Sequence, residues 1–160
     1  MKKYAYFSFF LIVNFYTQAQ VNLDSLWGVL NDETAPDTSR AKALQIIANE
    51  GYQYTQPDSC FYFAQMLFDF AREKGLKTYM VDALNTQGVS YYNSGEFSKA
   101  LEYYQQSLKI GEDISYKRGL AITLNNIGII HVQQGNYSKS MYYYQRSLKK
   151  IGRASCRERV

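Results

Sequence analysis

The sequence predicts an all-α solenoid of about three helical hairpins, preceded by a short capping helix. Two observations lead to this prediction: the chain matches itself at an offset of forty residues, and apolar residues within each unit follow helical spacing. The composition agrees, because 160 residues with 46% hydrophobic and 20% charged residues suit a globular domain. It excludes a disordered chain, a collagen-like chain and a disulfide scaffold.

Residues 1–19 have the parts of a secretory signal peptide. Two lysines precede an apolar run over residues 4–16, and Ala19 is the small residue at which cleavage is expected. The run is shorter than the about 20 residues that span a bilayer. A buried first helix and an uncleaved anchor are the alternatives. With cleavage, the mature protein begins at Gln20 and is periplasmic or secreted, or forms the periplasmic part of an inner-membrane protein.

Residues 20–40 are expected to hold a short amphipathic helix and a polar link. The spacing of Leu26, Trp27 and Leu30 indicates the helix, which would cover the open apolar side of the first repeat. The link, residues 31–39, ends in Asp-Thr-Ser, whose side chains are able to cap the next helix.

Residues 41–150 form the repeat region, with units at 41–80, 81–120 and 121–150, the last one truncated. The match of the second and third units is far above the about two identities that chance gives over this length. The identical pairs are Leu84/Leu124, Asn85/Asn125, Gly88/Gly128, Gly95/Gly135, Ser98/Ser138, Lys99/Lys139, Tyr103/Tyr143, Tyr104/Tyr144, Gln105/Gln145, Ser107/Ser147, Leu108/Leu148 and Lys109/Lys149.

Each unit reads as two helices joined by a turn that contains glycine in the second and third units. Gly88 and Gly128 fall inside the first helix, where glycine costs roughly 1 kcal/mol relative to alanine. Their recurrence in register predicts close approach of the second helix, with Ala100 and Ser140 as the small residues on that helix.

The second and third units resemble the tetratricopeptide repeat (TPR), because small and aromatic residues fall at the family's offsets in consecutive units. The period of forty exceeds the usual about 34, and we expect the extra residues in the link 112–117. The residues that carry the resemblance are Leu84, Gly88, Tyr91, Gly95, Phe97, Ala100, Tyr104, Ser107 and Leu108, then Leu124, Gly128, Gly135, Tyr137, Ser140, Tyr144, Ser147 and Leu148.

The resemblance implies a concave face, lined by the first helices, that binds a protein or peptide segment. Amide side chains can hydrogen-bond an extended backbone, and tyrosine supplies rigid contact area. The alternative for Asn85 and Asn125 is that they only bond neighbouring helices of the array. The expected concave residues are Gln45, Asn49, Tyr52, Asp82, Asn85, Val89, Tyr92, Asn125, Ile129 and Gln133.

Catalytic and metal-binding patterns are missing from the sequence. It has one histidine, His131, which takes the place of Tyr91 one unit later and is expected to pack between helices. Cys60 is expected to be a small buried hydrophobe. There is no zinc-ligand spacing, phosphate-binding loop or nucleophile elbow. We therefore predict a segment that is not an enzyme and holds no cofactor or metal.

The charge gives no indication of nucleic-acid binding. Thirteen basic and thirteen acidic residues balance between residues 20 and 150, and the formal net charge of +4 comes from the two ends. Residues 151–160 break the repeat and resemble a translated sequencing adapter, with a genuine basic tail as the alternative.

Two functions fit this organisation. The first is an extracytoplasmic TPR module that acts by binding a protein or peptide. The alternative is the truncated sensory region of a membrane-bound signalling protein, such as a histidine kinase, a nucleotide cyclase or a transcriptional regulator of the Bacteroidetes type. In that case a membrane contact would come only from a downstream transmembrane helix.

Overall fold

The computed structural model describes residues 23–54 and 57–155, with side chains for residues 23–49 and 59–152. The expected signal segment and residues 156–160 of the expected tail lie outside these ranges. The described elements are seven helices: α2 (Leu23–Asn31), α3 (Asp37–Tyr54), α4 (Pro57–Glu73), α5 (Lys77–Asn93), α6 (Phe97–Asp113), α7 (Lys117–Gln133) and α8 (Tyr137–Ser155). None of these helices is long and apolar enough to cross a membrane.

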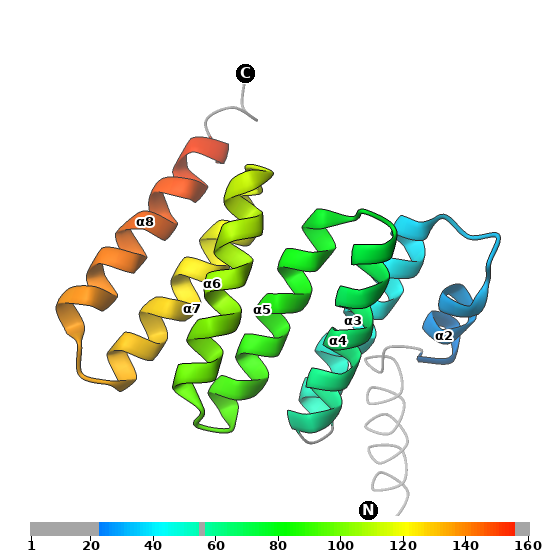
Figure 1. Cartoon of the computed structure of the whole chain (residues 1–160), viewed down its shortest axis with the longest axis horizontal. Helices are drawn as coiled ribbons and strands as arrows, with labels where there is room; N and C mark the ends of the chain where they lie inside the picture. The colour runs from blue at the N-terminus through cyan, green and yellow to red at the C-terminus, as the bar shows by residue number, and fades with distance from the viewer. Residues whose placement is uncertain (1–22, 55–56, 156–160) are drawn as a thin grey trace, which may run out of the picture.

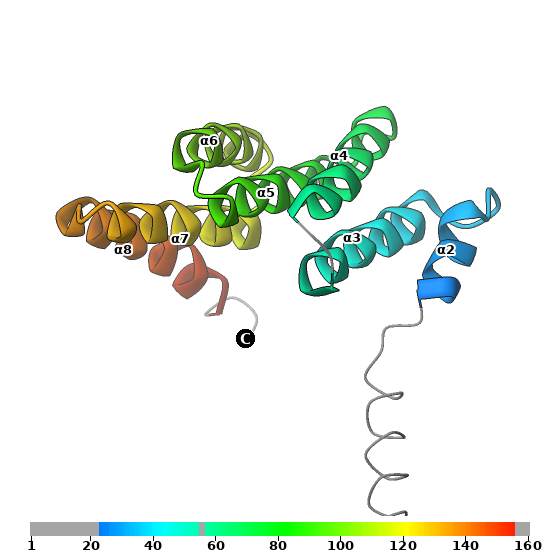
Figure 2. The ribbon, with the colours of Figure 1, turned by 90° about the horizontal axis from the view of Figure 1, so that it is seen from below.

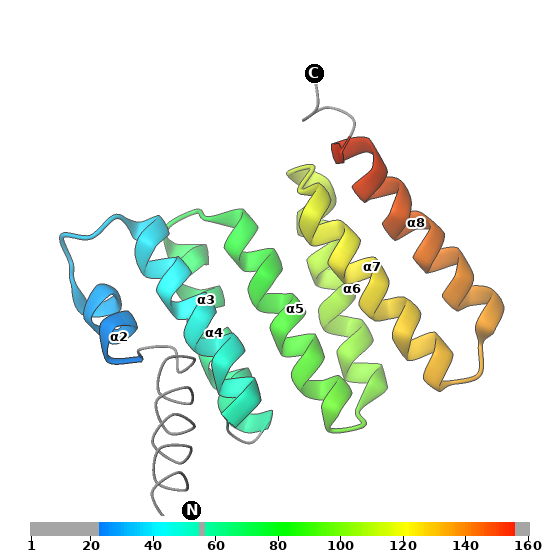
Figure 3. The same ribbon diagram turned by 180° about the vertical axis from the view of Figure 1, so that it is seen from behind.

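The helices stand in a row, with α2 at one end and α8 at the other (Figure 1). Consecutive helices pack as antiparallel hairpins, α3 with α4, α5 with α6 and α7 with α8. Seen from behind, α3, α5 and α7 run side by side on the near face, with α4 and α6 behind α3 and α7 (Figure 3). Figure 2 shows α6 lying in a separate layer from α7 and α8. The predicted all-α solenoid of hairpins is therefore confirmed.

The period of forty arises from long helices and not from a long link. Helices α5, α6 and α7 each contain 17 residues, and only residues 114–116 separate α6 from α7. The expectation that the extra residues lie in the link 112–117 is wrong. Helix α6 continues to Asp113 because Gly111 still packs on the next helix, against Leu120. The hairpins begin at residues 37, 77 and 117, each four residues before the expected unit boundary.

The turns between helices end each preceding helix in the same way. Gly95 and Gly135 have φ of 76° and 72°, a left-handed conformation that glycine adopts without a steric cost. The next backbone amide reaches back five residues, from Glu96 to the carbonyl of Tyr91 at 2.9 Å and from Asn136 to that of His131 at 2.8 Å. Ser115 occupies the same place after α6 with φ of 55°.

The helical glycines contact tyrosine rings of the second helix. A Cβ on Gly88 would overlap the ring of Tyr104, and one on Gly128 would lie 2.6 Å from a ring carbon of Tyr144. The expected partners Ala100 and Ser140 are buried, but they are not the atoms nearest the glycines. The close approach predicted from the glycines is therefore present, and an aromatic ring fills the space.

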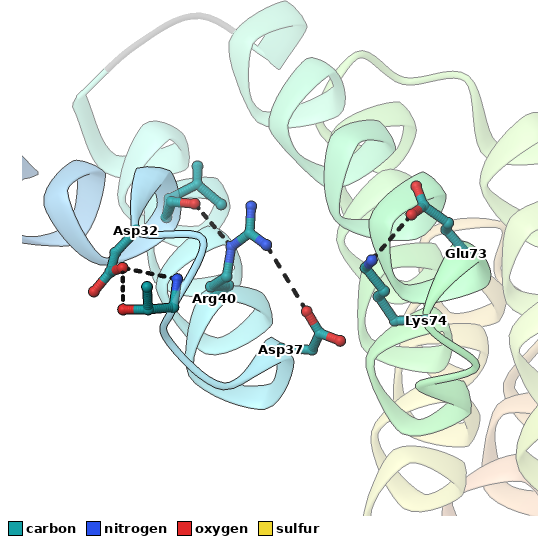
Figure 4. Close-up of polar contacts among 7 residues, drawn as sticks. Asp32, Asp37, Arg40, Glu73 and Lys74 are labelled. Atoms are coloured by element: carbon teal, nitrogen blue, oxygen red, sulfur yellow. Dashed lines mark hydrogen bonds and ion pairs between the residues drawn. The ribbon is translucent and has the colours of Figure 1, made fainter.

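Helix α2 covers the first hairpin, as its apolar spacing predicted. Leu26 and Trp27 pack against a core that includes Leu30 and Leu67, and the rings of Trp27 and Phe63 meet edge to face at 5.9 Å. The guanidinium Nε of Arg40 donates to the carbonyl of Leu30 at 3.0 Å, which joins α2 to α3 (Figure 4).

The expected burial of Cys60 is confirmed, since it is 1% exposed. Burial raises the pKa of its thiol. Helix α8 continues through residues 151–155 of the expected tail, where Ile151 is 53% exposed.

Candidate functional site: the groove of the first helices

An open groove of about 640 Å³ runs across the face formed by α3, α5 and α7. Each of the three helices contributes a stripe of mostly polar side chains to it. The lining residues are Lys42, Gln45 and Asn49 of α3, Thr78, Tyr79, Asp82, Asn85, Thr86 and Val89 of α5, Arg118, Ile122 and Asn126 of α7, with Tyr116 from the turn and Cys60 from α4. The groove therefore spans all three hairpins.

Five of the ten expected concave residues line this groove: Gln45, Asn49, Asp82, Asn85 and Val89. They come from α3 and α5, which confirms that first helices line the hollow face. Asn125 lies instead in a second hollow between α7 and α8. The side chain of Tyr52 lies outside the described residues.

The remaining three expected residues lie further along α5 and α7. The side-chain amide of Gln133 donates to the hydroxyl of Tyr92 at 3.2 Å, which links the ends of the two helices. Tyr92 and Ile129 are half-buried and Gln133 is exposed. Tyr92 also packs against Phe97, so part of its ring is used within the array.

Asp82 is the carboxylate that lines the groove. It accepts a hydrogen bond from the amide of Gln45 at 2.7 Å, which bridges α3 and α5. Burial raises the pKa of Asp82, and this rise is partly offset by the Gln45 hydrogen bond and by the charges of Arg118 and Lys42. The Tyr116 hydroxyl also bonds to this carboxylate, and burial raises the pKa of Tyr116. Groups of both charge signs therefore meet at the centre of the groove.

Asn85 lines the groove and joins neighbouring hairpins. It is 6% exposed, and its Oδ1 lies 2.9 Å from the hydroxyl of Thr123 on α7. The same hydroxyl lies 2.8 Å from the carbonyl of Gly119 and 3.0 Å from the hydroxyl of Ser107. Because one hydroxyl carries one proton, Thr123 alternates as donor between Asn85 and Gly119. Asn85 thus bonds within the array through its Oδ1, whereas its Nδ2 has no hydrogen-bond partner among the described residues.

Several groove residues were not expected from the sequence, among them Lys42, Thr86, Arg118, Ile122 and Asn126. A usable signal was present, because the positions 118, 122 and 126 recur at i+4 and place their side chains on one stripe of α7. Positions 42, 45 and 49, at spacings of three and four residues, also lie on one stripe of α3. The TPR-like positions selected amide, tyrosine, apolar and acidic residues and omitted the cations beside them.

His131 lies in an aromatic pair outside the groove lining. Its ring stacks on Tyr143 at 5.4 Å, in the way that Tyr91 stacks on Tyr103 at 5.3 Å one repeat earlier. The expected packing role of His131 is therefore confirmed. Across residues 23–54 and 57–155, no cluster of three or more His, Cys, Asp or Glu side chains could hold a metal ion.

Comparisons with known proteins agree with this architecture. A tetratricopeptide repeat family matches residues 79–150, which contain α6, α7 and most of α5 and α8. Residues 79–150 are therefore tetratricopeptide repeats. Among solved structures, the crystal structure of MamA is similar, with a TM-score of 0.57 and 18% identity over 84% of this chain and 81% of that chain. A search of curated proteins finds no significant match.

The repeats indicate the function in broad terms. TPR arrays are protein–protein interaction modules, and the fold is typically a non-catalytic scaffold. At 18% identity the likeness to MamA supports the fold and nothing more specific.

Proposed function

We propose that this TPR protein is an exported interaction module that binds an extended segment of a partner protein in the groove of α3, α5 and α7. The observation that carries the proposal is the continuous groove of about 640 Å³, to which three successive hairpins contribute side chains. Such a surface suits a ligand that follows the array from one repeat to the next.

The lining specifies the chemistry of the bound segment. Asn49, Asn126 and Thr86 offer hydrogen-bond donors and acceptors to a peptide backbone. Val89 and Ile122 provide small apolar contacts. Lys42 and Arg118 on either side of Asp82 favour a segment with at least one acidic and one basic side chain.

Selection of random displayed peptides on the folded protein tests this proposal. Asn49→Arg and Ile122→Arg place a long cation in the groove at positions that are exposed in the folded protein. We expect each variant to weaken binding of the selected peptides by about tenfold or more. Gln106→Arg, at an exposed position of α6, adds the same charge outside the groove and serves as the control.

Two results would contradict the groove as the binding site. One is that the groove variants and the α6 variant bind the selected peptides equally well. The other is that the selected peptides do not compete with one another for the protein, because they would then bind at separate places.

Export is the second part of the proposal and depends on residues 1–19. The charged start, the apolar run and Ala19 support cleavage before Gln20. Mass spectrometry of the protein from the extracytoplasmic fraction should give Gln20 as the first residue. A mature protein that retains residues 4–16 would contradict cleavage.

A further inference from the structure

A second cleft, separate from the groove of the first helices, lies where the end of α6 and the start of α7 meet the C-terminal half of α8 (top of Figure 1). Its volume is about 600 Å³, which is within the range of small-ligand sites. None of its lining residues also lines the groove. The lining residues are Glu112, Ser115, Lys117, Leu120, Tyr142, Arg146, Lys149 and Lys150.

Positive charge is in excess in this cleft. Half of its lining residues are Lys or Arg, and Glu112 is the one acid among them. Lys117, Arg146 and Lys150 are half-buried, so water and salt screen their charges less than on an open surface. Lys117, Lys149 and Lys150 form no ion pair or hydrogen bond with a residue whose side chain the structure describes. The lining therefore contains more positive charge than its own acid neutralises.

The guanidinium of Arg146 lies at the cleft with most of its donors available. Its Nη2 lies 3.5 Å from Oε1 of Glu112, which is long for a hydrogen bond. Its Cζ lies 5.6 Å from the centre of the Tyr142 ring, and this cation–π contact orients the group. Because a guanidinium has five N–H donors, Glu112 leaves donors for an acceptor with several oxygens.

The internal repeat does not by itself produce this charge. At the same register of α6, the four positions that α8 contributes to the cleft hold one acid and one cation. The exchanges from α6 to α8 are Glu102 to Tyr142, Gln106 to Arg146 and Ile110 to Lys150, whereas Lys109 and Lys149 are the same residue. The hairpin thus forms without the added cations, and packing within the repeat does not account for them.

The cleft lies on a side of the second helices that stays open when a further helix packs on the hairpin. Glu102, Gln106 and Lys109 are exposed on α6, although α7 packs against that helix. The side of α6 that α7 covers carries Leu101 and Leu108 instead. The equivalent cleft residues of α8 therefore stay accessible whatever packs on the apolar side of α8.

We propose that this cleft binds a phosphate group, either of a soluble phosphate compound or of a lipid headgroup, through Lys117, Arg146 and Lys149. A phosphate monoester carries about −1.5 to −2 charge at pH 7 and three strong acceptor oxygens. It therefore suits a guanidinium beside several ammonium groups better than a carboxylate with one charge does. This site is additional to the peptide groove and takes a small anion.

Isothermal titration calorimetry of the folded 160-residue chain with inorganic pyrophosphate is the first test. At about 0.15 M salt we expect saturable binding at one site, with a Kd below about 1 mM. The pair Lys117→Gln and Lys149→Gln should weaken binding by about tenfold or more. The pair Lys77→Gln and Lys109→Gln makes the same charge change one repeat earlier and should leave the affinity unchanged. Arg146→Gln restores the residue type of the earlier repeat, so it should stay folded and also weaken binding.

Sedimentation with lipid vesicles distinguishes the two sources of the phosphate group. The probes are vesicles of phosphatidylcholine with and without phosphatidic acid. Binding only to the vesicles with phosphatidic acid, reversed by pyrophosphate, would assign the site to a lipid headgroup. Binding of pyrophosphate without binding to either vesicle would assign it to a soluble phosphate compound.

Three results would overturn the proposal. The first is that pyrophosphate gives no saturable binding. The second is that acetate binds as tightly as pyrophosphate, because a single carboxylate would then suffice. The third is equal affinity of the two lysine pairs for pyrophosphate. The cations of residues 151–160 remain in both pairs and would then be the binding groups.

Discussion

The hairpins α5–α6 and α7–α8 have the same residue at many aligned positions, yet these residues have different surroundings. Asn85 is 6% exposed and bonds to Thr123, whereas its counterpart Asn125 is exposed. Tyr104 is 1% exposed and Tyr144 is half-buried. Helix α7 covers the first hairpin of the pair, and no described helix covers the second in this way. An identical residue thus takes its role from the neighbouring helix and not from its own sequence position.

The largest expected contrast concerns the helical glycines. In Gly88→Ala the new Cβ overlaps the ring of Tyr104, which is buried and has no room to move. We expect a loss of about 2 kcal/mol in the free energy of unfolding. Gly128→Ala meets the half-buried ring of Tyr144, which can shift towards solvent, and the gain in helix propensity offsets the strain. We expect Gly128→Ala to stay within about 0.5 kcal/mol of the wild type.

Chemical denaturation measures both effects, and a double variant provides the control. Gly88→Ala with Tyr104→Ala reproduces the pair Ala48 and Ala64 at the same register of the first hairpin. The double variant should cost at least about 1 kcal/mol less than the sum of the single variants. Equal losses for Gly88→Ala and Gly128→Ala would show that the covering helix does not restrict the ring.

The next contrast compares the two asparagines. Asn85→Ala removes the partner of a buried threonine hydroxyl, and we expect a loss of about 1–2 kcal/mol in the free energy of unfolding. Asn125→Ala removes an exposed amide, and the expected loss is below about 0.5 kcal/mol. Urea denaturation of the two variants measures both losses in the free energy of unfolding. Similar losses for Asn85→Ala and Asn125→Ala would mean that the covering helix α7 does not determine the role of the asparagine.

A smaller effect is expected at the turns. Ser115 has φ of 55° where Gly95 and Gly135 have 76° and 72°. Ser115→Gly should raise the free energy of unfolding by up to about 1 kcal/mol, because glycine adopts this conformation without strain. Gly95→Ser should lower it by a similar amount. Thermal melts of both variants measure these changes in stability. Changes of the same sign in both variants would contradict the prediction.

The smallest effect concerns the groove carboxylate and has a defined pH dependence. The pKa of Asp82 in the folded protein lies above its ordinary value of 3.8, mainly through burial. Folded protein therefore binds more protons than unfolded protein between the two values, and stability falls as the pH rises through that window. Asp82→Asn should raise the melting temperature at pH 7, and the difference should disappear below pH 3.8. A difference that persists at low pH would point to a cause other than ionisation.

The sequence predicted the helices well where the repeat was strong, because the same positions must bury the same faces in each unit. It misplaced the extra residues of the period, since Glu112 and Asp113 look like a polar link although they continue α6. The partner of Gly88 was also misjudged, because two small residues indicate close approach but do not identify the ring of Tyr104 that fills it.

The groove was harder to predict than the helices, because the roles of its residues depend on contacts between hairpins. Residue type and register could not show that Asn85 is buried by Thr123 while Asn125 is exposed. The cations Lys42 and Arg118 both line the groove, although they are 76 positions apart in the sequence.

Hydrogen–deuterium exchange with and without a selected peptide tests most directly the claim that the first helices form the binding face. We predict slower exchange in α3, α5 and α7 when the peptide is bound, with α4 and α6 unchanged. The protection should be lost in Asn49→Arg and retained in Gln106→Arg. Protection confined to α4, α6 or α8 would contradict the account, because the ligand would then lie outside the groove.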